Sequence, residues 1–186
     1  MCESSDAGLC IDHAYERRWH RVRKYASGIR NTVGLAWHPT SNNLWFTDNG
    51  RDRLGDDIPP CELNTATKKG QHFGYPYCHA GTIKDPEFGN KRPLLRFREA
   101  RTKSWCTRGT TWFEIYTGKQ FPAEYRNQVI ICEHGSWDRN KMNGYKLSLV
   151  KVDAKGKSLG YETFASGWLN EETQKAWGRL LWILYS

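Results

Sequence analysis

Residues 33–48 read VGLAWHPTSNNLWFTD, in which two apolar stretches are joined by a segment rich in turn-forming residues. The joining segment HPTSNN supplies Pro, Ser and Asn, which favour turns because they restrict the backbone or hydrogen-bond to it. Two short apolar runs separated by such a turn predict a β-hairpin. The polar stretch DNGRDRLG follows directly at 48–55, and a loop at the end of a strand is a common place for a binding site.

A second run of strand signals begins at residue 129, with VIICE, then YKLSLVKVD, then YETFA. The loop HGSWDRNKMNG separates the first two runs, and a DAKGK turn separates the last two. This pattern predicts a three-stranded meander, most of a propeller blade, since a blade has four strands in about 40–45 residues. Nine Trp, nine Tyr and 17 Gly against two Met also favour strands and turns over helices. We therefore predict an all-β chain.

The remaining stretches are less regular. Residues 59–89 contain PP, FGYPYC and DPEFG, and we expect a loop-like, ordered excursion stiffened by its aromatic rings. Residues 91–108 show neither a period of two nor a helical face, so no element is predicted there. The expected organisation is an N-terminal segment at 1–24, a partial β-propeller domain at 25–179 that contains the 91–108 stretch, and a short tail at 180–186.

The formal net charge of +8 is an excess that can favour binding to nucleic acid. Its distribution argues against that function, because most Lys and Arg are interspersed with Asp and Glu, and a solvated basic face is expected instead. No run approaches the ~20 apolar residues of a membrane-spanning helix, and no export signal is visible in the sequence. The densest basic cluster precedes the first predicted strand and comprises Arg17, Arg18, Arg21, Arg23 and Lys24.

The six cysteines show no CxxC pair and no His at zinc-finger spacing, which argues against a structural zinc site. Whether any of them form a disulfide stays open at this point. Cys132 lies in the apolar run VIIC. We expect it to be a buried thiol, because free Cys packs as a small hydrophobic side chain.

Six blocks of sequence occur in an order that is typical of one enzyme family. They are YASGIRNTVGLAWHP, LWFTDNGRDRLGDDIPP, ELN, HFGYPYCHAG, YTGKQFPAEYRNQ and EHGSWDR. The chain resembles the pyrroloquinoline quinone (PQQ) dependent sugar dehydrogenases, in particular the L-sorbosone dehydrogenase group and the soluble glucose dehydrogenases. The resemblance covers residues 25–89 and 115–179, and it implies a fragment of a six-bladed β-propeller, since the chain looks too short for a whole ring.

The resemblance implies that PQQ is bound by Arg30 and Asn31 in the SGIRN block and by Arg179 in the AWGR block. PQQ is a flat tricarboxylate, so Arg forks suit its carboxylates and amide donors suit its quinone oxygens. The alternative for the first two residues is a surface Arg and a turn Asn before a strand.

The resemblance also implies a Ca²⁺ ion held against the cofactor by the backbone carbonyls of Gly50 and Arg51. Calcium takes oxygen ligands, and main-chain oxygens serve as well as carboxylates. A tight glycine turn without a metal is the alternative for this loop.

A second, structural Ca²⁺ site is predicted at an acidic loop that ends at Glu62. Here the chain departs from the family pattern, because the residue before Glu62 is usually acidic and is Cys61 in this sequence. One lost carboxylate weakens a site for a hard cation. The other carboxylates of this predicted site are Asp52, Asp56 and Asp57.

In the family reaction, a His takes the proton of the sugar hydroxyl while hydride passes to the quinone and Ca²⁺ acts as a Lewis acid. The resemblance assigns that base to an earlier blade. None of His72, His79 and His134 falls at its position, so no catalytic residue is predicted in this chain. A supporting role for His134 near the pocket mouth is the hypothesis for the EHGSWDR loop.

The prediction is therefore a PQQ- and calcium-dependent oxidoreductase of aldose sugars or sorbosone, inactive as this chain alone. The alternatives are a non-catalytic propeller-like module that binds carbohydrate or protein, and a gene fragment without activity. Reading-frame errors would explain why 1–24, 91–108 and 180–186 match the family poorly. The expected partners are a small sugar and, through open blade edges, other copies of the chain. A periplasmic or secreted location is implied for the full-length family.

Overall fold

The structure is a computed structural model that describes residues 24–93, 102–104, 109–136, 139–181 and 183. The predictions for segment 1–24 and tail 180–186 therefore fall largely outside the described residues, as does most of the 91–108 stretch. Also outside are Cys2, Cys10, Cys106 and the basic cluster up to Arg23. In the part of the chain that is described, no helix is long and apolar enough to cross a membrane.

The first four-stranded sheet, called the first blade here, is antiparallel with the strand order β2, β3, β4, β8. The predicted hairpin is confirmed as the pairing of β2 with β3, in which Ala36 lies opposite Trp45. Every residue of β3 and β4 is buried. The strands are β2 (Leu35–Trp37), β3 (Leu44–Asp48), β4 (Cys61–Ala66) and β8 (Thr102–Ser104).

The second four-stranded sheet, called the second blade, has the order β9, β10, β11, β12, so each strand pairs with the next along the chain. The predicted meander is confirmed as β10, β11 and β12, and β9 completes the blade on the other side of β10. The strands are β9 (Thr110–Ile115), β10 (Val129–Glu133), β11 (Lys146–Val152) and β12 (Ser158–Ala165).

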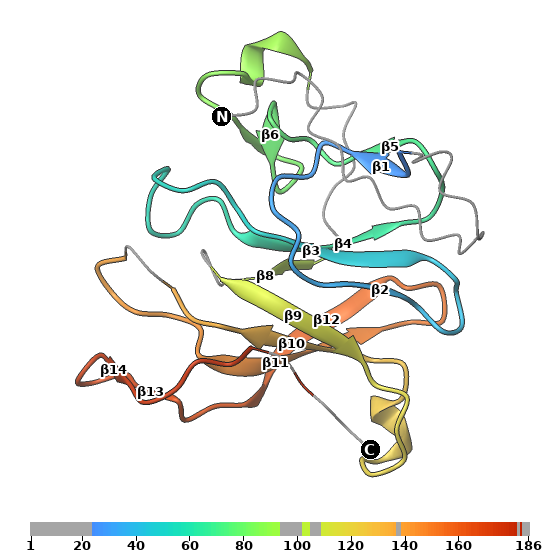
Figure 1. The fold of residues 1–186 in the computed structure, drawn as a ribbon, viewed down its shortest axis with the longest axis vertical. Helices are drawn as coiled ribbons and strands as arrows, with labels where there is room; N and C mark the ends of the chain where they lie inside the picture. Colours follow the sequence, from blue (N-terminus) through green and yellow to red (C-terminus); the bar gives the residue numbers. More distant parts are fainter. Residues whose placement is uncertain (1–23, 94–101, 105–108, 137–138, 182, 184–186) are drawn as a thin grey trace, which may run out of the picture.

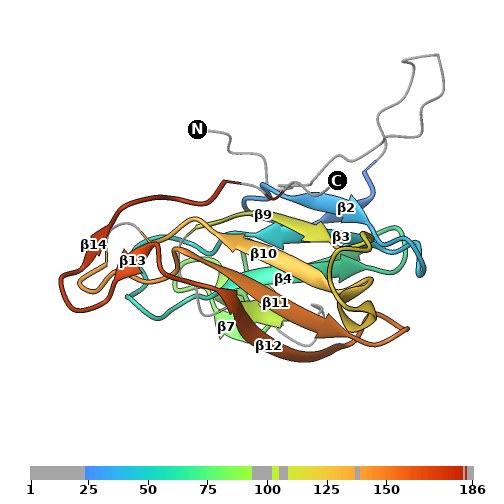
Figure 2. The same ribbon diagram turned by 90° about the horizontal axis from the view of Figure 1, so that it is seen from below.

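The two blades lie face to face, as Figures 1 and 2 show. Trp45 and Leu63 of the first blade share one apolar core with Phe113 and Ile131 of the second. The opposite face of the first blade is covered as well, because Phe46 packs with other buried residues outside the sheet. Those covering residues are Ala26, Ile29 and Phe73. Two stacked four-stranded antiparallel sheets are the arrangement of neighbouring propeller blades, so the prediction of an all-β, partial propeller is confirmed.

Residues 67–93 are the described part of the excursion between β4 and β8. It carries the short strand β5, which pairs in parallel with β1, and the β6–β7 pair. The β13–β14 pair follows the second blade. These elements are β1 (Ala26–Ser27), β5 (Gln71–His72), β6 (Cys78–His79), β7 (Ile83–Lys84), β13 (Leu169–Asn170) and β14 (Lys175–Ala176), with 3-10 turns at Gly89–Lys91 and Ala123–Tyr125.

The prediction of a loop throughout 59–89 is wrong at Cys61–Ala66, which is the buried strand β4. Its sequence, CELNTA, is half polar, and the alternation of apolar and polar residues is short because it ends at Asn64. It forms a strand because it lies between β3 and β8 and is covered on both faces. Two of its polar side chains are paired inside: Glu62 accepts the N–H of Ala80 at 2.6 Å and an amide N–H of Asn64 at 3.0 Å.

Candidate functional site

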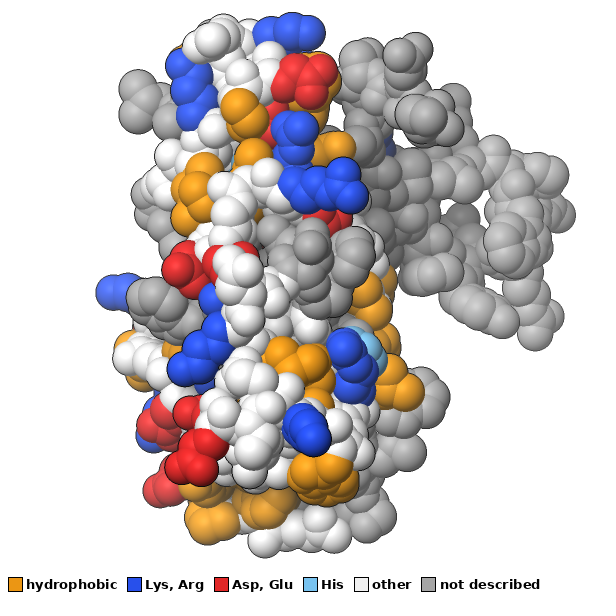
Figure 3. All heavy atoms as spheres, turned by 90° about the vertical axis from the view of Figure 1, so that its left-hand side faces the viewer, with side chains coloured by type: hydrophobic (Ala, Val, Ile, Leu, Met, Phe, Trp, Pro, Cys, Tyr) orange, Lys and Arg blue, Asp and Glu red, His pale blue; other side chains and the backbone are white. Residues whose placement is uncertain are grey.

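A cavity of about 390 Å³ lies where loops of the two blades meet. In Figure 1 the loops after β3 and β10 both lie on the left of the molecule. Figure 3 shows that side, on which Lys and Arg side chains stand among acidic and apolar ones. The cavity is lined by Arg30, Asn31, Asn49, Gly50, Asp52, Gly109, His134, Gly135 and Arg179.

The predicted cofactor and metal residues meet at this cavity with two exceptions. Arg30 and Asn31 come from the segment before β2, Gly50 from the loop after β3, and Arg179 from the segment after β14. The cavity lining does not include Arg51 or Glu62. The roles assigned to all of these residues stay predictions, but four of the six share one cavity.

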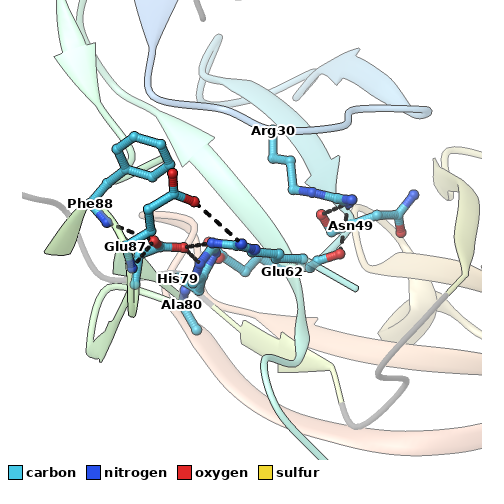
Figure 4. Close-up of polar contacts among 10 residues, drawn as sticks. Arg30, Asn49, Glu62, His79, Ala80, Glu87 and Phe88 are labelled. Carbon is cyan, nitrogen blue, oxygen red and sulfur yellow. Dashed lines mark hydrogen bonds and ion pairs between the residues drawn. The ribbon is translucent and has the colours of Figure 1, made fainter. Parts of the chain in front are cut away.

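Arg30 is bound to the loop after β3. Its Nη1 donates to the carbonyl oxygens of Asn49 at 3.1 Å and Gly50 at 2.7 Å, as Figure 4 shows for Asn49. Its Nη2 forms an ion pair with Asp52 at 3.0 Å. Two backbone carbonyls therefore point at one positively charged nitrogen, at the edge of the cavity.

Asp48, the last residue of β3, fixes the backbone on which Arg30 and Asn31 stand. Its carboxylate accepts the N–H of Asn31 at 2.7 Å and the N–H of Arg30 at 3.1 Å. Burial raises the pKa of Asp48 to about 6, and the hydrogen bonds from Asn31 and Arg30 only partly offset that effect. Sequence reasoning missed this role. The available signal was an acidic residue at the end of a strand that begins with three large apolar residues.

Arg179 reaches the cavity from the other side. Its guanidinium lies over the ring of Tyr145, 5.1 Å from the ring centroid. No carboxylate within the described ranges pairs with Arg179. Two arginines thus line the cavity. Arg30 is already in an ion pair with Asp52, whereas the guanidinium of Arg179 lies over an aromatic ring.

His134 is the histidine of the cavity lining. Its Nδ1 lies 3.0 Å from the carbonyl oxygen of Leu180, and its backbone N–H donates to Gly109 at 2.7 Å. Since a carbonyl oxygen only accepts, Nδ1 is the donor in this contact, which leaves Nε2 as the ring nitrogen not engaged by Leu180. Two further histidines of the family blocks lie elsewhere, since His79 is buried against Asp85 and His72 accepts a backbone N–H at 3.0 Å.

The carboxylates of the predicted second calcium site are directed to separate partners. Asp52 pairs with Arg30. Asp57 pairs with Arg139 at 2.9 Å, and the carbonyl oxygen of Asp56 accepts from the same guanidinium. Within the described ranges, no group of three or more His, Cys, Asp and Glu side chains is arranged to hold a metal. The second calcium site therefore stays a prediction, and the described carboxylates do not form a cluster at it.

The paired blades define part of a β-propeller, with a cavity between the loops of the two blades. A family model described as TrAA12-like matches residues 15–168. That match covers most of the chain, and the chain belongs to the TrAA12-like family.

Two relatives are similar in sequence. An uncharacterised protein of Borreliella burgdorferi is 40% identical over 152 residues, which is 81% of this chain and 40% of that protein. The aldose sugar dehydrogenase YliI of Escherichia coli is 25% identical over 172 residues, 87% of this chain and 43% of that enzyme. The chain spans less than half the length of these relatives.

Solved structures show the same fold at low identity. The iodide structure of the Trichoderma reesei enzyme of carbohydrate-active enzymes family AA12 matches with a TM-score of 0.63 and 18% identity, covering 78% of this chain and 45% of that one. Its calcium structure gives 0.57 and 20%, with 78% and 44% covered. The PQQ-bound aldose sugar dehydrogenase of Streptomyces coelicolor gives 0.52 and 18%, with 78% and 34% covered.

Proposed function

We propose that this chain is the cofactor-binding part of a PQQ- and calcium-dependent oxidoreductase that acts on aldose sugars or sorbosone. The observation that carries the proposal is the convergence of Arg30, Asn31, Gly50 and Arg179 on one cavity. These residues come from three separate stretches of the sequence. A family relative that is an aldose sugar dehydrogenase supports it.

The charges of the cavity suit an anionic, planar cofactor. Arg179 can pair with a carboxylate without first giving up an ion pair, and its place over Tyr145 restricts the guanidinium to one orientation. Arg30 keeps N–H donors free after its bonds to Asn49, Gly50 and Asp52, because a guanidinium has five. The amides of Asn31 and Asn49 supply neutral donors at the same cavity.

The backbone carbonyls proposed to bind a calcium ion are those of Gly50 and Arg51. Gly50 lines the cavity, and its oxygen already faces a cationic group, since it accepts from Arg30 Nη1 at 2.7 Å. Each carbonyl oxygen has a second lone pair, and such oxygens are ordinary Ca²⁺ ligands. When bound, PQQ would supply the hydride acceptor and Ca²⁺ the Lewis acid.

Binding is tested by titrating the purified chain with PQQ and following the quinone absorbance, with CaCl₂ or with EGTA. We expect saturable binding that requires calcium. Arg179→Gln should weaken it about 10–100-fold, the effect of one charge-assisted hydrogen bond. Arg126→Gln is the matched control, because Arg126 is exposed and does not line the cavity. Equal binding by the Arg179 and Arg126 variants would contradict the assigned role, and no binding by the wild-type chain would overturn the proposal.

We further propose that the 186-residue chain alone does not turn over sugar. The family resemblance does not place the base at His134, and a positioned base typically contributes ~10²–10⁴ in rate. A dye-linked assay with glucose and sorbosone, with a full-length relative as control, checks this. Turnover within tenfold of the control would contradict the proposal. It would also point to Nε2 of His134 as the base, since Nδ1 is already engaged with the carbonyl oxygen of Leu180.

A second function, carbohydrate binding without catalysis, is favoured by a stacked pair of tryptophans, one of them exposed, beside the β13–β14 pair. Trp168 and Trp177 stack with centroids 6.2 Å apart, and Trp177 is 75% exposed. Its indole N–H donates to Gly167 at 2.6 Å, which fixes the ring plane. A flat, exposed indole can stack on the apolar face of a sugar. Quenching of tryptophan fluorescence by oligosaccharide, with no spectral change of PQQ, would favour this function.

A further inference from the structure

The loop after β3 is anchored on its far side by the side chain of Arg51. Gly50 lines the cavity, but the guanidinium of the next residue is directed toward the excursion that carries β6 and β7. Arg51 Nη1 lies 2.5 Å from Asp85 Oδ2, and Nη2 lies 3.8 Å from Glu87 Oε2. Figure 4 shows this cluster of contacts, around His79, Glu87 and Phe88, beside the one formed by Arg30 and Asn49. Two consecutive residues therefore belong to two different networks.

Asp85 is arranged to receive that guanidinium. Its side chain is only 1% exposed, yet both carboxylate oxygens are hydrogen-bonded. Oδ1 accepts the N–H groups of Glu87 and Phe88 at 2.9 Å each. Oδ2 lies 2.9 Å from Nε2 of His79, in addition to its contact with Arg51. A carboxylate fixed by four groups is a rigid attachment point for a partner side chain.

The pKa of Asp85 agrees with this arrangement. Burial by itself raises it, but the hydrogen bonds from Phe88, His79 and Arg51 lower it to about 2. Asp85 is therefore ionised at neutral pH, as an ion pair with Arg51 requires.

The cavity side of the same loop is restrained as well. Arg30 contacts the carbonyl oxygens of Asn49 and Gly50. A Cβ added at Gly50 would lie 2.7 Å from the carbonyl oxygen of Pro59, closer than a real Cβ atom comes. The backbone at Gly50 is thus bounded by Arg30 and Pro59, and the Arg51 side chain holds the residue that follows.

We propose that Arg51 and Asp85 are a positioning pair, which sets the direction of the Gly50 and Arg51 carbonyls at the edge of the cavity. The inference rests on the proposed function, because it takes those carbonyls as calcium ligands. Groups that orient metal ligands without touching the metal typically account for 10–100-fold in metal affinity. Arg51 therefore acts through its side chain, in addition to the carbonyl role that the sequence suggested.

Three substitutions test the ion pair between Arg51 and Asp85 apart from the neighbouring contacts. Arg51→Gln removes the charge and both contacts. Asp85→Asn removes the charge but keeps an oxygen that can accept the N–H groups of Glu87 and Phe88, so the local turn is preserved. Arg51→Lys keeps the charge but cannot span Asp85 and Glu87 together. Arg53→Gln is the matched control: it is the same change two residues along the same loop, at an exposed side chain.

The measurement is the calcium concentration at half-saturation of PQQ binding, read from the quinone absorbance without any substrate. We expect a 10–100-fold increase for Arg51→Gln and for Asp85→Asn, and a smaller one for Arg51→Lys. The double variant Arg51→Gln/Asp85→Asn should raise the calcium midpoint no further than either single variant, because each single change already breaks the same ion pair. Arg53→Gln should match the wild type. Circular dichroism and urea midpoints identify any variant that fails to fold. If Arg51→Gln does not fold, the conservative variants Arg51→Lys and Asp85→Asn test the inference.

Two results would overturn the inference in distinguishable ways. If the wild-type chain binds PQQ with calcium and the Arg51 and Asp85 variants show the same calcium midpoint, the positioning role is wrong and the proposed function stands. Additive increases of the calcium midpoint in the double variant would also show that Arg51 and Asp85 do not act as a pair, and the proposed function would again stand. If the wild-type chain does not bind PQQ at all, the proposed function fails, and the inference fails with it.

Discussion

At the scale of single residues, the groups that shape the cavity are mostly buried beneath it. Asp48 holds the N–H groups of Arg30 and Asn31, and Asp85 holds the side chain of Arg51. Neither carboxylate lines the cavity. Because buried polar groups are costly to leave unpaired, each fixes its partners tightly. The lining residues were suggested by family blocks, whereas these supports became visible only in three dimensions.

The pH dependence of stability should reveal Asp48. Its pKa is raised to about 6 in the folded chain, above the ~3.9 of an unfolded Asp. The folded state therefore holds the proton more tightly, so this contribution is fully present below pH ~4 and lost as the pH rises through about 6. The Asp48→Asn variant has no carboxyl group at this position, so its stability lacks this dependence on pH. In urea denaturation, the stability of the wild type relative to Asp48→Asn should fall between pH 4 and pH 7, by ~3 kcal/mol at most.

The control for Asp48 is Glu172→Gln, a charge removal at an exposed position. Its stability difference from the wild type should stay constant over the same pH range. A constant difference for Asp48→Asn as well would show that Asp48 titrates normally in the folded chain.

Cys132 should be inert to thiol reagents in the folded chain. Burial raises its pKa to about 12, so almost no thiolate exists at pH 8, and the thiolate is the reactive form. Peptide-resolved mass spectrometry after iodoacetamide treatment should find Cys132 unmodified in the native chain and modified in guanidinium chloride. Rapid modification of the native chain would mean that β10 opens readily.

At the scale of elements, the sequence predicted strands that alternate or are uniformly apolar and missed those that are neither. VIICE and LWFTD were identifiable because apolar residues fill them, and Cys132 was correctly predicted to be buried. β4, with CELNTA, and β9, with TTWFEI, were not predicted. β4 is a strand because partners on both sides and both faces bury it, and that information lies in residues far along the chain. The same holds for the carbonyl and carboxylate contacts around the cavity.

Phe113 of β9 is the side chain whose loss should cost most at the interface between the blades. It is 1% exposed and shares a core with Trp45 and Leu63 of the other blade. Phe113→Ala should lower the free energy of unfolding by ~3–5 kcal/mol, because it removes apolar contacts and leaves a cavity. Leu159→Ala on β12 is the control, since Leu159 is 65% exposed, and should stay within ~0.5 kcal/mol. Equal effects in urea denaturation would place Phe113 outside the core.

At the scale of the whole molecule, the two blades are one structural unit. They share an apolar core, and Arg139 of the second blade contacts Asp56 and Asp57 in the loop after β3 of the first. The cavity exists only where both blades supply their loops. A change that separates the blades therefore removes the site together with the core.

Thermal unfolding should accordingly be a single transition. Thiol labelling as a function of temperature reports each blade separately, because buried Cys61 belongs to β4 of the first blade and buried Cys132 to β10 of the second. We expect the two melting curves to coincide, as in a cooperative two-state unit. Midpoints that differ by several degrees would show that one blade survives the loss of the other.

The excursion between β4 and β8 also has a consequence for the order of events as the chain folds. The strands of the second blade are joined by short connections, at 116–128, 134–145 and 153–157, and β4 follows its partner β3 after a similar connection at 49–60. β8, the other partner of β4, comes only after residues 67–101. Contacts between distant residues form late, because closing a long loop loses more chain entropy before any contact compensates. The pairing of β8 with β4 should therefore form after the second blade has assembled. In pulse-labelled hydrogen exchange, the amides of β10 and β11 should become protected before those of β8.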